Sequence, residues 1–227
     1  MSAVQQSIQI PAAGVSLEVD IMVPDPARGL VLFAHGSGSS RHSPRNRLIA
    51  QDLQDAGLAT ALIDLLTARE EQRDYLSGEL RFNIPLLAVR VVALTDWVVE
   101  HEPTSGLGVG LFGASTGAAA ALVAAAHRPD SVQAVVSRGG RPDLAGDFLR
   151  MVHQPTLLIV GGNDPEVIEL NRKAMTELRG PKRLEIVPGA THLFEEPGTL
   201  QQVARLAKDW FLQHLKPLPQ PAERSAD

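Results

Sequence analysis

A glycine-flanked serine joins two segments of opposite character, and this junction constrains the fold more than any other feature. Val109 to Phe112 is an apolar run of strand length, Gly113-Ala114-Ser115-Thr116-Gly117 follows, and a run of alanines then extends to Ala126. The pattern predicts a buried strand, a sharp turn and a helix of small residues. Glycines on both sides of the serine leave room at a strained turn, where a Cβ would strike the neighbouring backbone.

Ser115 therefore occupies the position of a nucleophile at a strand-to-helix turn, where its hydroxyl stands free above the edge of a sheet. The backbone N–H of Thr116, at the start of the helix, is available to an oxyanion. The alternative interpretation is an ordinary strand-to-helix turn in which Ser115 only caps the helix.

A serine hydroxyl is a poor nucleophile at neutral pH, so it needs a general base that an acid orients. His192 follows the last predicted strand, at the edge where the carboxyl ends of parallel strands meet. Asp164 follows the preceding strand and stands directly before Pro165, which suits the first turn of a helix. The alternatives are a structural loop histidine and an aspartate that only caps its helix.

Glu166 is the rival acid, but one residue past the proline we expect it to lie on the helix and point elsewhere. The chain order of Ser115, Asp164 and His192 is that of α/β hydrolases and differs from the orders of chymotrypsin and subtilisin.

The oxyanion needs a second donor besides Thr116. The loop His35-Gly36-Ser37-Gly38-Ser39-Ser40 follows an apolar run of strand length, and its glycines allow a backbone N–H to face the substrate. We assign this role to the N–H of Ser37, with Gly36 as the hinge, and expect the His35 side chain to brace the loop. The alternative, a flexible glycine-serine linker, is disfavoured directly after a buried strand.

Short apolar runs alternate with helical segments along the whole chain, which is typical of a mostly parallel sheet with helices on both faces. The predicted strands are 8–10, 15–23, 30–34, 59–63, 109–112, 132–136, 156–160 and 184–187, and the predicted helices are 47–56, 84–100, 118–126, 166–178 and 200–214. The polar segment 65–81 is predicted to be a small lid or a surface helix. We expect a single α/β domain over 1–214 with no large cap domain and a shallow or open pocket, followed by a disordered tail over 215–227.

Composition excludes several classes of function. The formal net charge of -5 argues against nucleic-acid binding, which needs a concentrated basic surface. No stretch approaches the ~20 apolar residues that span a bilayer, so no membrane partner is expected. The chain has no cysteine, which excludes disulfides, thiolate metal sites and a cysteine nucleophile, and fits a cytoplasmic protein.

Four motifs together resemble the α/β-hydrolase superfamily, and within it the small capless group called dienelactone hydrolase-like. They are His35-Gly36-Ser37-Gly38-Ser39-Ser40-Arg41, Phe112-Gly113-Ala114-Ser115-Thr116-Gly117, Val136-Ser137-Arg138-Gly139-Gly140-Arg141-Pro142-Asp143-Leu144 and His192-Leu193-Phe194-Glu195-Glu196-Pro197-Gly198. The resemblance implies a Ser/Asp/His hydrolase that acts on ester-like carbonyls through an acyl-enzyme, with no metal and no organic cofactor. Dienelactone hydrolase proper uses a cysteine where this chain has Ser115, so turnover of dienelactone is not predicted.

Several arginines follow predicted strand ends, and we name Arg41 and Arg138, together with Gly36, as candidate substrate contacts. Arginines at this edge can clamp a carboxylate or phosphate of the substrate. The alternative is that they pair with nearby acids such as Asp64 and Asp143.

The sequence thus predicts a serine hydrolase, monomeric or homodimeric, that cleaves a small ester, lactone or thioester. A catalytically silent binding protein on the same fold and an acyl transferase with the same triad are the alternatives.

Overall fold

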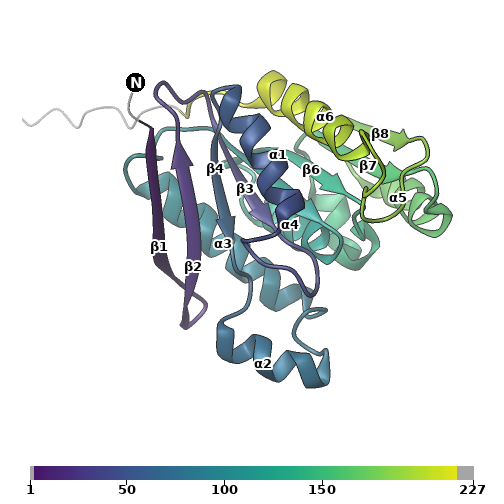
Figure 1. Cartoon of the computed structure of the whole chain (residues 1–227), viewed down its shortest axis with the longest axis horizontal. Coiled ribbons are helices and arrows are strands. Elements are labelled where there is room, and N and C mark those ends of the chain that lie inside the picture. Colours follow the sequence, from purple (N-terminus) through teal and green to yellow (C-terminus); the bar gives the residue numbers. More distant parts are fainter. Residues whose placement is uncertain (1–2, 219–227) are drawn as a thin grey trace, which may run out of the picture.

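The computed structural model describes residues 3–218, in which eight strands form one sheet in the order β1-β2-β4-β3-β5-β6-β7-β8 (Figure 1). The pairs β1/β2 and β2/β4 are antiparallel and all the others are parallel. The elements are β1 (Val4–Ala12), β2 (Val15–Val23), β3 (Leu30–Ala34), α1 (Pro44–Asp55), β4 (Ala59–Ile63), α2 (Ala68–Ser77), α3 (Ile84–Glu100), β5 (Val109–Ala114), α4 (Thr116–His127), β6 (Val132–Arg138), the 3-10 segment η1 (Pro142–Met151), β7 (Thr156–Gly161), α5 (Pro165–Glu177), β8 (Lys182–Val187) and α6 (Thr199–His214).

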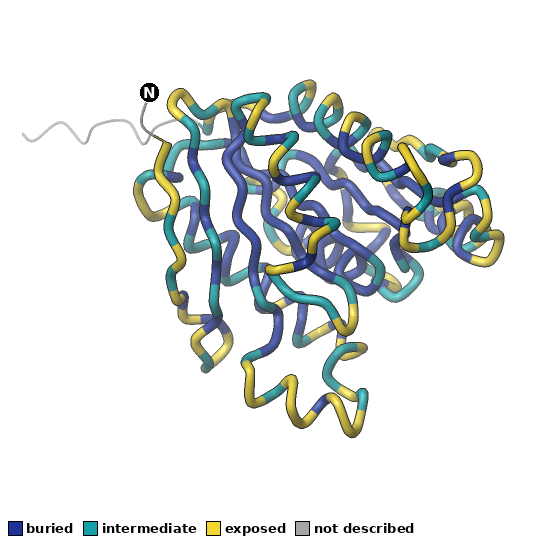
Figure 2. Tube along the Cα trace, in the orientation of Figure 1, coloured by how far each residue is buried: buried dark blue, intermediate teal, exposed yellow. Residues whose placement is uncertain are grey.

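Helices cover both faces of the sheet, and each face has its own apolar core. Helices α1 and α6 lie on one face, and α3 and α4 lie on the other (Figure 1). Every residue of β3, β4 and β5 is buried, as the dark central strands of Figure 2 show. Helix α4 is buried on nearly all sides, which its alanines permit because small side chains let a helix pack closely between sheet and neighbours.

The predicted α/β-hydrolase fold is confirmed, and the described residues form no cap domain. Helix α1 was predicted to start at Arg47, which is wrong, because it begins at Pro44 with the Ser43 side chain accepting the N–H of Asn46. Proline at the first position and serine before it are both standard helix-start signals. The 3-10 segment η1 was not predicted.

The polar segment 65–81 contains the surface helix α2, which projects from the body of the molecule and is mostly exposed (Figures 1 and 2). Thr67 and Glu70 form a reciprocal capping box that starts it. Of the tail predicted over 215–227, Leu215 packs in the core and the N–H of Leu218 donates to Gly106 O at 2.8 Å, while residues 219–227 lie outside the described residues. In the part of the chain described, no helix has the length and apolar character to cross a bilayer.

Candidate active site

Ser115 stands at a strained turn between β5 and α4. Its φ of 51° and ψ of -122° are rare for a residue with a side chain, and such strain gathers at functional sites. A Cβ at Gly113 would clash with Ala118, and a Cβ at Gly117 would clash with Ala34 O, so both flanking positions require glycine. Ser115 holds the N-cap position of α4, yet its side chain makes no capping hydrogen bond. The hydroxyl is therefore free for another role.

Asp164 and His192 are brought together from two loops at the same sheet edge, with His192 Nδ1 2.7 Å from Asp164 Oδ2. Asp164 precedes α5 but its side chain does not cap that helix. The rival acid, Glu166, is exposed in the first turn of α5. Hydrogen bonding of Nδ1 to the carboxylate places the ring proton there and leaves Nε2 as the acceptor nitrogen.

No hydrogen bond within 3.5 Å links Ser115 Oγ to His192 Nε2 among residues 3–218. Free enzymes commonly hold this contact long and shorten it when substrate binds. The loop of His192 is anchored nearby by Phe194, which is 1% exposed and adopts a positive φ of 57°. Gly139 packs closely against the backbone of His192, since a Cβ at position 139 would stand 3.1 Å from His192 O.

The loop after β3 lies against the turn that carries Ser115. A Cβ on Gly36 would come within 2.9 Å of Ser115 Cβ, so only glycine fits without displacement. The buried imidazole of His35 accepts the N–H of Leu65 at Nε2 and donates from Nδ1 to Gly36 O, both at 2.9 Å. Burial lowers the pKa of His35, which keeps the ring neutral. The expected bracing role of His35 thus has a defined geometry.

Both residues of the expected oxyanion donors line one pocket. They are Ser37 and Thr116, and no acceptor among the described residues takes the backbone N–H of either. Ser115, Asp164 and His192 are not among the residues that line this pocket. The pocket has a volume of about 630 Å³ and is walled by the 36–40 loop, the start of α1 and the helix α2, which contributes Glu71 and Tyr75. Sequence reasoning placed a lid or surface helix here but missed these lining residues. The Thr67–Glu70 capping box was the available signal for the helix.

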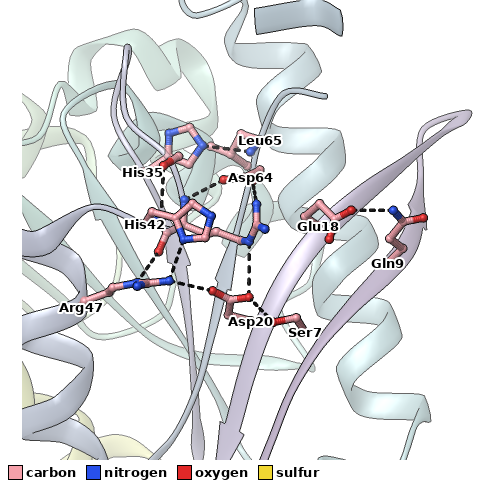
Figure 3. A network of polar contacts seen from close by, with 11 residues as sticks. Ser7, Gln9, Glu18, Asp20, His35, His42, Arg47, Asp64 and Leu65 are labelled. Atoms are coloured by element: carbon pink, nitrogen blue, oxygen red, sulfur yellow. Dashed lines mark hydrogen bonds and ion pairs between the residues drawn. The ribbon is translucent and has the colours of Figure 1, made fainter. Parts of the chain in front are cut away.

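Arg41 forms ion pairs with two aspartates. Its guanidinium contacts Asp64 and lies 3.3 Å from Asp20 Oδ1. Asp20 also accepts hydrogen bonds from Ser7 and Arg47, so it links β1 and β2 to α1 and, through Arg41, to the loop before α1 (Figure 3). This is the alternative that the sequence left open, and it removes the support for Arg41 as a substrate contact.

The other arginines near this sheet edge differ in their partners. Arg141 pairs with Asp143 at 2.7 Å, as the alternative also anticipated. Arg138 is buried beside the turn at Ser115. Its backbone O accepts the N–H of Ser115 at 3.2 Å, and its Nη2 donates to Asn46 Oδ1 at 3.1 Å. Its neighbour Arg45 lines the pocket. Within residues 3–218, no three His, Asp or Glu side chains are grouped to hold a metal ion.

Comparison with known proteins supplies the family. The sequence pattern of the dienelactone hydrolase family matches residues 23–218. The crystal structure of a dienelactone hydrolase from Anabaena variabilis is 56% identical, with a TM-score of 0.92 over 94% of this chain and 99% of that chain. Est1E from Butyrivibrio proteoclasticus, 16% identical, shares the fold with a TM-score of 0.75 over 91% of this chain and 98% of its own.

Two relatives from Mycobacterium tuberculosis, provisionally named phosphoribosyl transferases, are 56% identical over 92% of this chain. The chain spans only 46% of their length. Because the hydrolase pattern covers residues 23–218 and a 56% identical dienelactone hydrolase aligns over nearly its full length, the chain belongs to the dienelactone hydrolase family of α/β hydrolases.

Proposed function

We propose that this chain is a serine hydrolase that cleaves a small ester, lactone or thioester through an acyl-enzyme on Ser115. His192 is the general base and Asp164 orients it. The observation that carries the proposal is the 2.7 Å contact between His192 Nδ1 and Asp164 Oδ2, made by an aspartate that leaves its own helix uncapped.

The reaction follows from these groups. Ser115 Oγ attacks the carbonyl carbon while His192 Nε2 takes the hydroxyl proton, and Asp164 stabilises the imidazolium that forms. The N–H groups of Ser37 and Thr116 donate to the oxyanion of the tetrahedral intermediate. The imidazolium then protonates the leaving group, and a water activated by His192 releases the acid and restores the serine. The His35 contact to Gly36 O supports this arrangement, because in a planar trans peptide it turns the N–H of Ser37 to the opposite side.

The transferase name of the curated relatives does not alter this proposal. The hydrolase pattern accounts for residues 23–218, so we assign the phosphoribosyl chemistry to the part of those relatives that this chain does not span.

Labelling with a fluorophosphonate probe tests the proposal. We expect one adduct on Ser115 in wild-type protein and none in Ser115→Ala, together with loss of p-nitrophenyl acetate hydrolysis in that variant. Folded protein that takes up no probe would favour the silent binding protein. Acyl transfer to added alcohols or amines in preference to water would favour the acyl transferase.

A further inference from the structure

Arg138 carries a buried positive charge that no carboxylate compensates. The residue is 6% exposed, its only hydrogen bond among the described side chains goes to the neutral Asn46, and its Nε is buried without an acceptor. Burial, with the nearby charge of Arg45, lowers the pKa of Arg138 to about 10. A desolvated charge without a counter-charge destabilises the folded protein, so stability alone gives no reason to keep it.

The same chain treats another buried arginine differently. Arg90 is 1% exposed, and it donates to Glu70 Oε1 at 2.6 Å and to Leu65 O at 2.5 Å. The missing carboxylate is therefore a local property of the region around Arg138.

Arg45 adds a second, partly compensated charge to this region. Its Nη1 lies 3.4 Å from Glu195 Oε1, at the outer limit of a hydrogen bond, and the Glu195 side chain is 64% exposed. Its Nε is buried without an acceptor in residues 3–218, and its side chain lines the pocket. The acids that line this pocket, Glu71 and Asp74, both belong to α2, and Arg81, which also lines it, pairs with Asp74 at 2.6 Å. Among the described residues, no acid lines the pocket on the α1 side, so the positive charge of Arg45 and of the nearby Arg138 is a local feature of that side.

This positive charge lies next to the nucleophile. Arg138 ends β6 in register with Ala114, the residue before Ser115. Arg45 and Asn46 occupy the first turn of α1, where the helix dipole adds further positive potential. Arg45 and Thr116 line the same pocket, so a ligand bound there can lie close to the Arg45 charge and to the residue of the expected oxyanion donor. Arg138 does not line this pocket, but its backbone O accepts the N–H of Ser115 and its Nη2 donates to Asn46 in the first turn of α1.

We propose that Arg45 and Arg138 form a subsite for a phosphate group carried by the substrate that Ser115 attacks. The only carboxylate that either guanidinium contacts among the described residues is the exposed Glu195, on Arg45. Two guanidiniums compensated in this way match a dianion better than a singly charged carboxylate, and guanidinium forks fit phosphate oxygens. The inference that the bound phosphate belongs to the substrate rests on the proposed hydrolase function, whereas the inference of an anion-binding site does not.

Direct binding of inorganic phosphate tests the subsite without turnover. Isothermal titration calorimetry on Ser115→Ala protein is expected to show saturable phosphate binding that weakens about tenfold or more when Arg45→Gln is added. The matched control is Arg47→Gln, two residues along the same helix, whose side chain is 52% exposed and pairs with Asp20. This control is expected to leave the phosphate affinity within a factor of about two.

Acetate and Arg138 variants sharpen the result. Acetate is expected to bind about tenfold more weakly than phosphate, and Arg138→Lys to weaken phosphate binding because lysine lacks the planar fork. Equal phosphate affinity in the Arg45→Gln and control proteins would overturn the proposal, as would acetate binding as tightly as phosphate. Arg45→Gln keeps the test decisive if the buried Arg138 variants fail to fold.

A matched pair of p-nitrophenyl esters, with and without a phosphate on the acyl part, connects the subsite to catalysis. In the Ser115 protein, Arg45→Gln is expected to lower the ratio of kcat/KM for the phosphorylated over the plain ester about tenfold, and Arg47→Gln to preserve it. Phosphate binding that depends on Arg45 without fluorophosphonate labelling would reject the hydrolase function and keep the anion site. Labelling without phosphate binding would reject the site alone.

Discussion

Replacing Asp164 by asparagine tests the catalytic arrangement most directly. The substitution keeps the size of the side chain but removes the negative charge 2.7 Å from His192 Nδ1. An asparagine amide can also donate to Nδ1, which would move the ring proton to Nε2 and leave the base unable to accept a proton from Ser115.

The loss can be estimated from the geometry. The Asp164 side chain is 15% exposed and that of His192 is 39% exposed, so an intermediate effective dielectric constant applies. Charges about 4 Å apart at a dielectric constant of about 20 attract by about 4 kcal/mol, which corresponds to a rate factor of about 10³. The wrong tautomer raises the expected loss in kcat/KM toward about 10⁴.

The assay is the steady-state hydrolysis of short-chain p-nitrophenyl esters, with circular dichroism to confirm folding. Glu166→Gln is the matched control, because Glu166 is a carboxylate two residues away that is exposed. We expect this control to keep kcat/KM within a factor of about two. A larger loss in Glu166→Gln than in Asp164→Asn, or an Asp164→Asn enzyme within tenfold of wild type, would refute the reasoning.

Three further perturbations have defined outcomes. Ser115→Gly is expected to abolish ester hydrolysis and yet raise the free energy of unfolding in urea by about 1 kcal/mol, because glycine relieves the φ of 51°; a less stable variant would contradict the strain. Gly36→Ala is expected to lower kcat/KM about 10- to 100-fold, since its Cβ would stand 2.9 Å from Ser115 Cβ, and wild-type kinetics would show that the loop yields freely. Burial lowers the pKa of His35 from its ordinary value of 6.5, so below that pH the unfolded chain binds more protons than the folded protein. The contribution of His35 to the free energy of unfolding is therefore full above pH 6.5. It falls, by at most about 1.4 kcal/mol per pH unit, as the pH drops further. Burial also lowers the pKa of His214, which adds a loss of stability of the same sign at low pH. The measurement therefore compares urea unfolding of wild type and His35→Asn at several pH values. Equal slopes of unfolding free energy against pH in the two proteins would count against a neutral buried His35.

Local signals account for the parts of the fold that were predicted well. The helix α3 has the predicted bounds, and β5 with α4 follows the glycine pattern around Ser115. The late start predicted for α1 was an avoidable error, because Ser43 and Pro44 already mark the helix start in the sequence. The 3-10 segment η1 has no comparable periodic signal, and a positive φ of 55° at Gly146 interrupts it.

The candidate site also has features that the sequence predicts and features that it does not predict. The strand-to-helix turn at Ser115 and the candidate residues Asp164 and His192 could be predicted from strand ends and glycines. The extent of the pocket could not be predicted, because the projecting helix α2 lines it with residues that are distant in sequence from Ser115. The prediction of an open pocket was based only on the lack of an insertion large enough for a cap domain.

The amino-acid order by itself determined the strand, turn and helix around Ser115, since glycine spacing and apolar runs act over a few neighbouring residues. The sequence favoured Asp164 over Glu166 as the partner of His192, but only the tertiary structure brings the two side chains into contact and leaves Arg138 without a carboxylate. The Asp164 contact joins residues 28 apart in the chain, and the Arg138 contact to Asn46 joins residues 92 apart. Such pairings depend on which faces of helices and strands pack together, and the order of charged residues along the chain does not show this packing.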